Sequence, residues 1–292
     1  MAVVYGELLG ELRPSRLAQS ATPGAQVVLS SISHGASAGP RWSGLTLRFV
    51  GRGTEHYTIE GRHYRVDEHQ LMIAPQMLGS EVEIRRNGGF NTLGLCIFLP
   101  DPGDGTAALV DGPIVLPVSC GLGDTLKSAL RRIHTPLRCD EEPARAARDA
   151  RLQLGHTLGE IDRQLAVVPA VRRRTRFETV RRMNLARAYL HHVTSRTVSL
   201  DELAVAAAVS PFHLLRGFRD CFGETPAAYH RRLRLTLARE AAVNDGQTYA
   251  FVADRFGFAG GASFSHAYRR TFGTAPVRQL AARSRLTTEA AR

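Results

Sequence analysis

The sequence predicts an α+β protein with a β-rich N-terminal domain, two amphipathic helices and an all-α C-terminal domain. Short apolar or alternating segments separated by turn residues run up to about residue 118. Leucine and isoleucine repeats at helical spacing follow between residues 121 and 168. One helical pattern then occurs twice, about 50 residues apart. At 292 residues, the chain has room for two domains of ordinary size.

The N-terminal segments are typical of short β-strands. They include LTLRFV, QLMIAP and TLGLCIFLP, and the separators are rich in turn residues, as in GRG at 51–53 and NGG at 87–89. Many short strands with tight turns and no intervening helices favour an antiparallel barrel or sandwich. We assign residues 1–120 to this domain.

Residues 121–168 predict two amphipathic helices, separated by Pro136 and Pro143. Their apolar residues either cover the open edge of the barrel or contact a second copy of the chain. Near-heptad spacing favours the dimer interface. The candidates in the second helix are Leu154, Leu158, Ile161 and Leu165. The proline and arginine cluster of VPAVRRRTRF then indicates an exposed linker at about 169–178.

The excess positive charge lies entirely in the C-terminal part. Residues 171–292 hold 21 Arg, no Lys and 9 acidic residues, a net charge of +12, whereas residues 1–170 hold 17 basic and 18 acidic residues. Such asymmetry indicates a polyanionic partner. A solvated surface rich in arginine would give the same net charge. The sequence motifs are therefore needed to distinguish it from a polyanion-binding surface.

Residues 199–223 predict a helix, a tight turn and a second helix. Ser199 and Glu202 form an S-x-x-E capping box, and Ser210 precedes a proline at the first position of the second helix. Leu214 and Phe218 lie four apart and face inward. The opposite side combines apolar residues with arginines: Phe212, Leu215, Arg216 and Arg219. This stripe fits a recognition helix in the major groove, although the two apolar side chains could instead pack on the following helix.

The same pattern recurs in the second half of this domain. An offset of 49 relates Ala204 to Ala253, and an offset of 50 relates Leu214, Phe218, Arg219, Phe222, Gly223 and Pro226 to Phe264, Tyr268, Arg269, Phe272, Gly273 and Pro276. A one-residue slip confined to the turn indicates a structural repeat. The segment between the units, TPAAYHRRLRLTLAREAAVN, predicts a long helix that would let both units enter successive major grooves, about 34 Å apart.

Residues 176–282 resemble the AraC family of bacterial transcription regulators. The resemblance rests on SP-x-HL-x-x-x-F-x-x-x-x-G-x-TP-x-x-Y, R-L-x-x-A, V-A-x-x-x-GF and F-x-x-x-F/Y-R-R-x-FG-x-x-P. It implies a double helix-turn-helix DNA-binding domain at 179–283, a cupin-like effector or sensor barrel at 1–120 and dimerising helices at 121–168. The implied function is sequence-specific regulation at promoters in the cytoplasm. The implied partners are double-stranded DNA and a second copy, with a small-molecule effector and RNA polymerase as further candidates.

By position, the family's base-contacting sites fall at Phe212, Leu215 and Arg216, and in the second unit at Ala262, Ser263 and His266. The second set departs from the usual pattern, since arginine is common where His266 stands. His266 could equally be a plain surface histidine. We therefore expect the second unit mainly to grip phosphates. The phosphate candidates are Arg219, Arg269 and Arg270, any one of which could pair with a carboxylate instead.

The sequence offers little for other chemistries. The histidines His34, His56, His63 and His69 lack an H-x-H pair, and the cysteines Cys96, Cys120, Cys139 and Cys221 lack a CxxC pair, so we expect no metal, no cofactor and mostly buried thiols. No catalytic set stands out, and no apolar run has membrane-spanning length. Two alternatives stay open: a barrel that only dimerises, and a barrel enzyme fused to a DNA-binding module.

Overall fold

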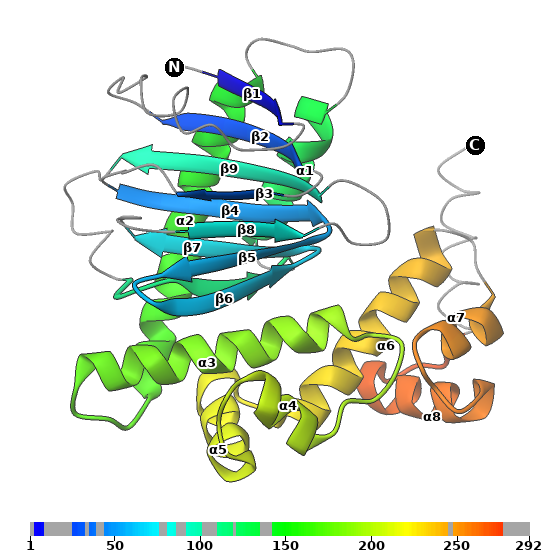
Figure 1. Ribbon diagram of the computed structural model, residues 1–292. Coiled ribbons are helices and arrows are strands. Elements are labelled where there is room, and N and C mark those ends of the chain that lie inside the picture. The colour runs from blue at the N-terminus through cyan, green and yellow to red at the C-terminus, as the bar shows by residue number, and fades with distance from the viewer. Residues whose placement is uncertain are drawn as a thin grey trace. The chain divides into compact units, whose positions relative to one another are not determined.

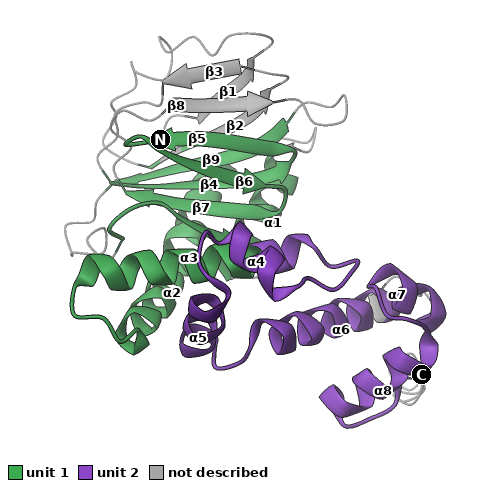
Figure 2. Cartoon of the chain, turned by 60° about the horizontal axis from the view of Figure 1, so that its bottom comes forward, with its two compact units in different colours: residues 1–188 green, residues 189–292 purple. Residues whose placement is uncertain are grey.

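The computed structural model divides into two compact units, residues 1–188 and residues 189–292 (Figures 1 and 2). The boundary between the units falls inside one helix, α3 (Arg173–His192). The structure describes residues 3–8, 25–32, 35–38, 44–75, 81–85, 92–100, 110–118, 121–134, 142–244 and 248–276.

The described strands of unit 1 form two sheets. One sheet has the order β1-β2-β9-β4-β7-β10 and the other β3-β8-β5-β6. All pairs are antiparallel except β1 with β2. The bounds are β1 Val3–Leu8, β2 Gln26–Ile32, β3 Gly35–Ala38, β4 Gly44–Arg52, β5 Thr54–Ile59, β6 Arg62–Asp67, β7 Gln70–Pro75, β8 Glu81–Arg85, β9 Thr92–Pro100 and β10 Ile114–Pro117.

The predicted α+β class is confirmed, whereas the predicted barrel is not. Over the described ranges the strands belong to two separate sheets, and no closed barrel is seen. Each strand segment named from the sequence is a strand. The sequence reading missed β1 and β3, the second of which is only four residues long and consists of Gly, Ala and Ser. Such residues give little of the β-branched or aromatic signal by which strands are recognised.

Strand β4 is buried on both faces because it lies between a helical layer and the second sheet. Val50 joins Tyr57 and Tyr64 of the other sheet in one apolar cluster. On the opposite face, a Cβ atom at Gly51 would collide with Leu130 of α1 (Gly121–His134). Since successive side chains of a strand alternate between faces, Thr46 and Arg48 share the inner face with Val50.

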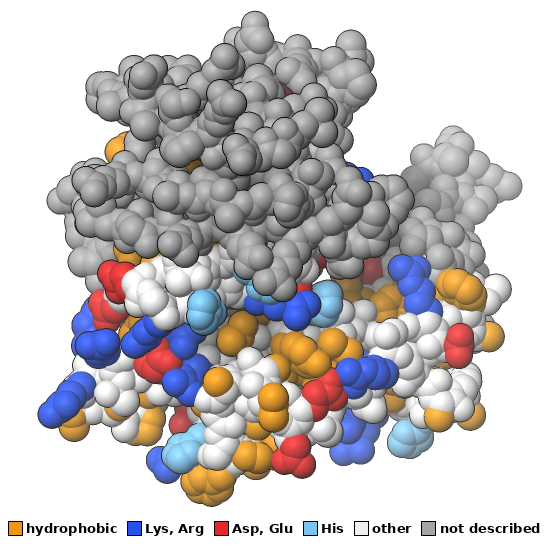
Figure 3. All heavy atoms as spheres, in the orientation of Figure 1, with side chains coloured by type: hydrophobic (Ala, Val, Ile, Leu, Met, Phe, Trp, Pro, Cys, Tyr) orange, Lys and Arg blue, Asp and Glu red, His pale blue; other side chains and the backbone are white. Residues whose placement is uncertain are grey.

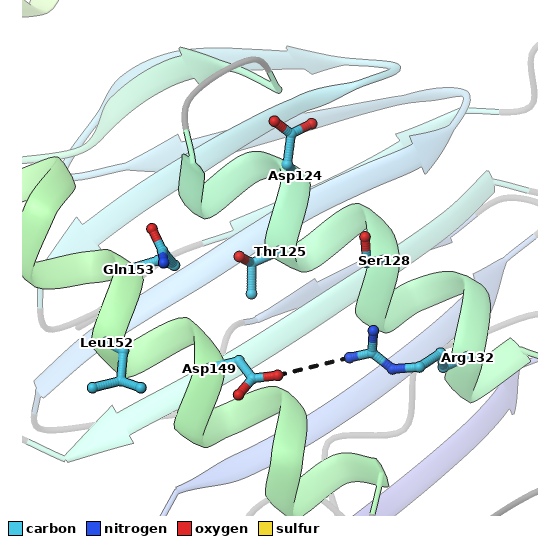
Figure 4. A pocket seen from close by; sticks show the side chains of 7 residues that line it. All are labelled: Asp124, Thr125, Ser128, Arg132, Asp149, Leu152 and Gln153. Carbon is cyan, nitrogen blue, oxygen red and sulfur yellow. Dashed lines mark ion pairs between the residues drawn. The ribbon is translucent and has the colours of Figure 1, made fainter. Parts of the chain in front are cut away.

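Helices α1 and α2 (Glu142–Val167) lie on the six-stranded sheet (Figure 4). The residues predicted to form a dimer interface are buried within the chain itself, with exposed fractions of 5% or less: Leu154, Leu158, Ile161 and Leu165. They therefore belong to the core of unit 1, in line with the alternative that the helices cover the β-domain, and the preferred dimer interface at these positions does not fit their burial. The physical reason is that a helix packed on a sheet and a helix packed on a partner carry the same apolar spacing.

Helix α3 begins inside the segment that the sequence reading assigned to a linker. Residues 173–178 are helical, and Phe177 is 4% exposed. Glu178 accepts hydrogen bonds from Arg181 and Arg182 at 2.7–2.9 Å, which lowers the pKa of its carboxyl group to about 2. Within the predicted linker, Arg173 pairs with Asp111 at 3.2 Å, a partner that lies 62 positions away and that no local pattern indicates.

Unit 2 is helical throughout its described residues. It contains the end of α3, then α4 (Leu200–Ala206), α5 (Pro211–Phe222), α6 (Pro226–Asn244), α7 (Tyr249–Arg255) and α8 (Gly261–Phe272). Ser199 and Ser210 cap α4 and α5 as predicted, each accepting a hydrogen bond from a backbone N–H three residues on. Gly223 and Gly273 end α5 and α8 in the left-handed conformation, at φ +77° and +76°. These matching ends confirm the repeat.

A set of contacts, here called the brace, ties the loop before α4 to the second repeat. His230 on α6 donates a hydrogen bond from Nε2 to the carbonyl of Val193 at 2.7 Å. Arg234, 4% exposed, donates to the carbonyls of Phe256 and Gly257 at 3.0 and 3.1 Å. Gly257, at φ +67°, lies so close that an added Cβ atom would collide with the backbone of Ser195. The brace therefore fixes the second repeat against the beginning of the first.

The two turns of the repeat differ in backbone strain, because a non-glycine residue holds a positive φ in the first turn only. This difference gives a prediction about the stability of unit 2. Ala208 adopts φ +53° where the second repeat has Gly257. Ala208→Gly should stabilise unit 2 by about 1 kcal/mol by removing the left-handed strain. Gly257→Ala should destabilise unit 2 by more than about 2 kcal/mol, because strain and collision add. Hydrogen exchange of α5–α8 amides in the full chain measures both changes.

Gly273→Ala is the matched control, because Gly273 has the same positive φ but no atom within 4 Å of an added Cβ. It should cost only the strain. Equal losses of protection for Gly257→Ala and Gly273→Ala would show that the contact with Ser195 is unimportant.

His230 gives a pH prediction. Burial, followed by the charges of Arg234 and Arg196, lowers the pKa of its ring although the Val193 hydrogen bond opposes this. The unfolded chain therefore binds the proton more readily, and the stability that the neutral ring contributes is fully present above about pH 6.5 and is lost as the pH falls below it. His230→Gln keeps an amide donor for Val193 and should flatten the pH dependence of unit 2 protection between about pH 6.5 and 5. The exposed His213→Gln control should not, and an unchanged slope for His230→Gln would contradict the assignment.

Candidate nucleic-acid interface

Helix α5 is held to unit 2 by one apolar side. Leu214 and Phe218 are fully buried, and the Phe218 ring lies 4.5 Å from Phe222 and 5.5 Å from Tyr229 of α6, measured between centroids. Aromatic pairs at such distances add to the stability that burial alone supplies. The orientation of α5 about its own axis is therefore fixed.

The opposite side of α5 is exposed, as the sequence predicts. Phe212 is 71% exposed, Leu215 is 41% exposed, and Arg216 and Arg219 are both exposed. The alternative that Phe212 and Leu215 pack on α6 is therefore wrong. Arg216 lies 4.0 Å from Asp220, but an exposed pair at this distance contributes little and leaves the guanidinium available.

Helix α8 repeats this construction with shorter side chains. Phe264 and Tyr268 are fully buried, and the opposite face is exposed. The exposed residues include the candidates Ala262, Ser263, His266, Arg269 and Arg270. Gly260 precedes the helix and provides no side-chain cap, in contrast to Ser210 before α5. The first N–H groups of α8 therefore lack the side-chain acceptor that α5 has, and such groups favour an anion.

The three arginines predicted to meet phosphates lie in the last turns of α5 and α8. Arg219, Arg269 and Arg270 are exposed, and within the described ranges none of them forms an ion pair with a carboxylate. Figure 3 shows arginine side chains interspersed with apolar ones over the helical part of the chain. The alternative that one of these three arginines is used in a carboxylate pair finds no support in the described residues.

One residue of this surface was missed from the sequence. His213 is exposed on the first turn of α5, its ring lies 5.9 Å from that of Phe212, and its Nδ1 atom lies 2.7 Å from the Ser210 hydroxyl. The N-terminal residues of a recognition helix are those that contact base edges. Its position directly after Phe212 was the available signal.

Unit 1 carries a groove between two helices, and no metal-ligand cluster is found among the residues that are described. Cys96 is buried, which raises the pKa of its thiol to about 11, and Cys221 of unit 2 is half-buried and forms no disulfide with another described cysteine. His34, Cys120 and Cys139 lie outside the described residues. The groove, of about 320 Å³, runs between α1 and α2 and includes Leu152, which is 67% exposed (Figure 4). Its charged lining residues are Asp124, Arg132 and Asp149.

Comparison with known sequences assigns the helical repeat. A family model described as a helix-turn-helix domain matches residues 203–281. The probable transcriptional regulator LumQ of Photobacterium leiognathi is 31% identical over 90 residues, which cover 31% of this chain and 36% of LumQ. The HTH-type transcriptional regulator ArgR of Pseudomonas aeruginosa is 33% identical over 79 residues, which cover 27% of this chain and 24% of ArgR. The matched part of the chain thus spans 36% of the length of LumQ and 24% of that of ArgR.

Solved structures resemble the chain more weakly. An AraC-type transcriptional regulator from Chromobacterium violaceum has 27% identity, covers 34% of this chain and 89% of its own, and has a TM-score of 0.33. ToxT from Vibrio cholerae, solved with an unsaturated fatty acid bound, has 10% identity, covers 89% and 95%, and has a TM-score of 0.34. Both TM-scores are too low to support an argument about function.

The assignment therefore depends on the sequence matches and on the repeated motifs, and both concern the helices of unit 2. None of the described helices is both long and apolar enough to cross a membrane. The matching helix-turn-helix model, the regulator relatives and the two equivalent helix pairs thus show that residues 203–281 are similar to the helix-turn-helix domains of transcription regulators.

Proposed function

We propose that the protein is a sequence-specific DNA-binding transcription regulator that acts at promoters in the cytoplasm. The observation that carries the proposal is the exposed side of α5, where Phe212, Leu215 and Arg216 project from a helix whose other side is buried. Exposed apolar side chains of this size are costly in water and call for a partner. Thymine methyl groups and guanine edges in the major groove are such partners.

The two helix pairs have different roles in this proposal. Phe212, Leu215 and Arg216 of α5 read bases, and Arg219 binds phosphate. Ala262, Ser263 and His266 of α8 face the second groove without a long hydrogen-bond donor, so that Arg269 and Arg270 supply most of the affinity there through phosphates. The uncapped beginning of α8 supports this division.

Unit 1 is, in this proposal, a cupin-like sensor that binds an effector and mediates dimerisation, and RNA polymerase is a further partner. Its two-layered sheet structure covered by helices has the size of such a domain. A barrel that only dimerises and a barrel enzyme remain the competing functions. No observation on the described residues favours the enzyme.

Two arginine variants test the proposed roles of α5 in base recognition and of α8 in phosphate binding. The preferred site is first selected from a random DNA pool, and affinities are then measured for that site and its single-base variants at several salt concentrations. Arg216→Ala should lose about 1–3 kcal/mol of discrimination at one base position, because a guanidinium forks onto one guanine edge. Arg269→Ala should weaken all sequences about equally and lower the salt slope by about one.

The matched control for these variants is Arg232→Ala. Arg232 is an exposed arginine of α6 that pairs with Glu224, and it lies on neither recognition helix. It should change neither the preference nor, by much, the salt slope. Selection of no sequence at all by the full chain would refute the proposed function, and full base preference in Arg216→Ala with its loss in Arg269→Ala would reverse the two roles.

The proposed homodimer needs an interface other than the buried apolar residues of α2. The α1–α2 groove is the candidate, because Asp124, Arg132 and Asp149 line it and opposite charges can pair across a two-fold axis. Leu152→Glu should therefore yield monomers in sedimentation velocity, whereas Val167→Glu, which changes a 52% exposed residue at the end of α2, should leave dimers. A monomeric wild-type chain at micromolar concentration would contradict the proposal.

A further inference from the structure

Part of the positive charge of the C-terminal sequence lies outside the helix-turn-helix repeat. Residues 171–188 hold seven Arg and one acidic residue, a net charge of +6, whereas residues 189–292 hold 14 Arg and eight acidic residues, also a net charge of +6. The structure places the first of these segments in unit 1. Half of the C-terminal excess therefore belongs to a unit to which the proposed function assigns no contact with DNA.

The arginines of this segment form a stripe along one side of α3. Phe177 and Val180 bury the other side of the helix in unit 1. Arg62 of β6 reaches the stripe, because its Nη1 atom lies 3.5 Å from the Oε2 atom of Glu178. Figure 3 shows arginine side chains gathered over the beginning of α3. The helical members of the stripe follow at positions i, i+4, i+7 and i+8, which share one face of a helix: Arg174, Glu178, Arg181 and Arg182. Together with Arg62 they are here called the basic stripe.

Glu178 is the one acidic residue of the segment, and three guanidinium groups share its carboxylate. Arg181 donates hydrogen bonds to it at 2.8 and 2.9 Å and Arg182 donates one at 2.7 Å, in addition to the contact with Arg62. The hydrogen bonds from Arg181 above all lower the pKa of this carboxyl group to about 2, so that it carries one full negative charge at neutral pH. One carboxylate cannot balance three cations. Among the described residues, no carboxylate lies within ion-pair distance of Arg174.

The beginning of α3 is an unfavourable place for so much positive charge. Arg173, Arg174 and Arg176 occupy its first turn without an acidic residue, whereas α1 and α2 have Asp124 and Glu142 in their first turns. Because the N-terminus of a helix carries a partial positive charge, cations at this end are destabilising. The Nε atom of Arg176 is in addition buried without a hydrogen-bond partner. The stability of the helix does not explain these residues, and an external anion would offset their repulsion.

The chemistry of the basic stripe fits phosphate groups. All its cations are arginines, whose planar guanidinium groups donate two parallel hydrogen bonds to phosphate oxygens. The large apolar side chains of residues 173–182 are buried, whereas insertion into a lipid surface requires exposed ones. The stripe thus offers charge without apolar contacts, which is how proteins bind the backbone of nucleic acids without reading its sequence.

Helix α3 also ties the basic stripe to the unit proposed to bind DNA. The helix runs without a break from Arg173 to His192, and its last residues belong to unit 2. DNA bound by unit 2 is therefore held at a high local concentration near the stripe. A contact tethered in this way needs little affinity of its own.

We propose that the basic stripe of unit 1 binds backbone phosphates of the duplex that flanks the site recognised by unit 2. The inference rests on the proposed function, because a recognised site is what brings flanking DNA to the stripe. The contact is independent of the flanking sequence and adds to the salt dependence of binding. Arg62 and Arg174 are exposed and meet the phosphates. Arg181 lies between Glu178 and the ring of Tyr64, 5.6 Å from the ring centroid, and holds the stripe in position.

The experiment compares two duplexes with the full chain: the selected site alone, and the same site extended by arbitrary sequence on both sides. The wild type should bind the extended duplex more tightly and with a steeper dependence on salt. Arg62→Gln combined with Arg174→Gln should lower the salt slope on the extended duplex by about two and leave the slope on the short duplex unchanged, because each lost phosphate contact changes the slope by about 0.9. This change corresponds to about tenfold in affinity between about 50 and 200 mM salt.

Arg148→Gln combined with Arg163→Gln is the matched control. Both residues are exposed arginines of α2 in the same unit, and this double variant removes the same amount of charge. It should keep the difference in slope between the two duplexes. The melting temperature of unit 1 should not fall in either double variant, because all four side chains are exposed and the shared contact of Arg62 contributes little.

Three outcomes would overturn the proposal. Equal salt slopes of the wild type on the two duplexes would show that flanking DNA is not contacted, and the stripe would then serve another polyanionic partner, such as an acidic protein or a lipid surface. An equal loss on both duplexes would assign Arg62 and Arg174 to the recognised site itself. An equal effect of the control variant would reduce the contribution of the stripe to net charge.

Failure of the proposed function gives a different result. In that case the full chain selects no sequence, and binding is measured on a long duplex of random sequence. If the stripe variant weakens this binding and the control variant does not, sequence recognition is refuted and the basic stripe remains a duplex-binding surface.

Discussion

The proposed DNA-facing surface depends on the burial of two residues in each of α5 and α8, four positions apart. Helices of 12 residues or fewer are marginal by themselves, so α5 and α8 exist because Leu214 with Phe218, and Phe264 with Tyr268, are buried against their neighbours. Since a helix has only one such side, burying it decides which residues meet solvent. The exposed side is thus a consequence of the packing, and residues on it can vary without loss of the fold.

This division explains how the two repeats can share a scaffold and differ in chemistry. Both helices end in a left-handed glycine and bury aromatic rings, yet the positions of Phe212 and Leu215 in α5 are occupied in α8 by the exposed Ala262 and the half-buried Ser265. The connecting helix, α6, has 19 residues, about 28 Å at 1.5 Å per residue. A helix of that length could still pivot at its ends. The brace through His230, Arg234 and Gly257 restrains such a pivot.

Local signals explain which features the sequence could predict. Caps, turn glycines and inward pairs depend on residues within about four positions of one another, and these predictions are confirmed at Ser199, Ser210, Leu214 and Phe218. The failures concern features set by distant residues. The apolar spacing of α2 could not show whether a sheet or a second copy covers it, and Arg48 reads as a surface residue of an alternating strand until the second sheet is placed over it. The hydrogen bonds of the brace join residues 22 to 37 positions apart, and its contact between Gly257 and Ser195 joins residues still more distant in sequence, so no local pattern predicts it.

Helix α3 has a consequence for how this chain can be taken apart. Its first sixteen residues bury Phe177, Val180 and Met183 in unit 1, whereas Tyr189 in its last turn bonds to Glu202 of unit 2. A protease needs an extended, accessible segment, and the boundary between the units lies within a regular helix that offers none. A fragment that begins at residue 171 would carry three large apolar side chains stripped of their cover, and one that begins at residue 189 would lose most of the helix. The two units therefore have separate cores, but neither can be expressed alone without disrupting α3. A transfer of the helical unit to another protein would have to include α3, which packs on the sheets of unit 1.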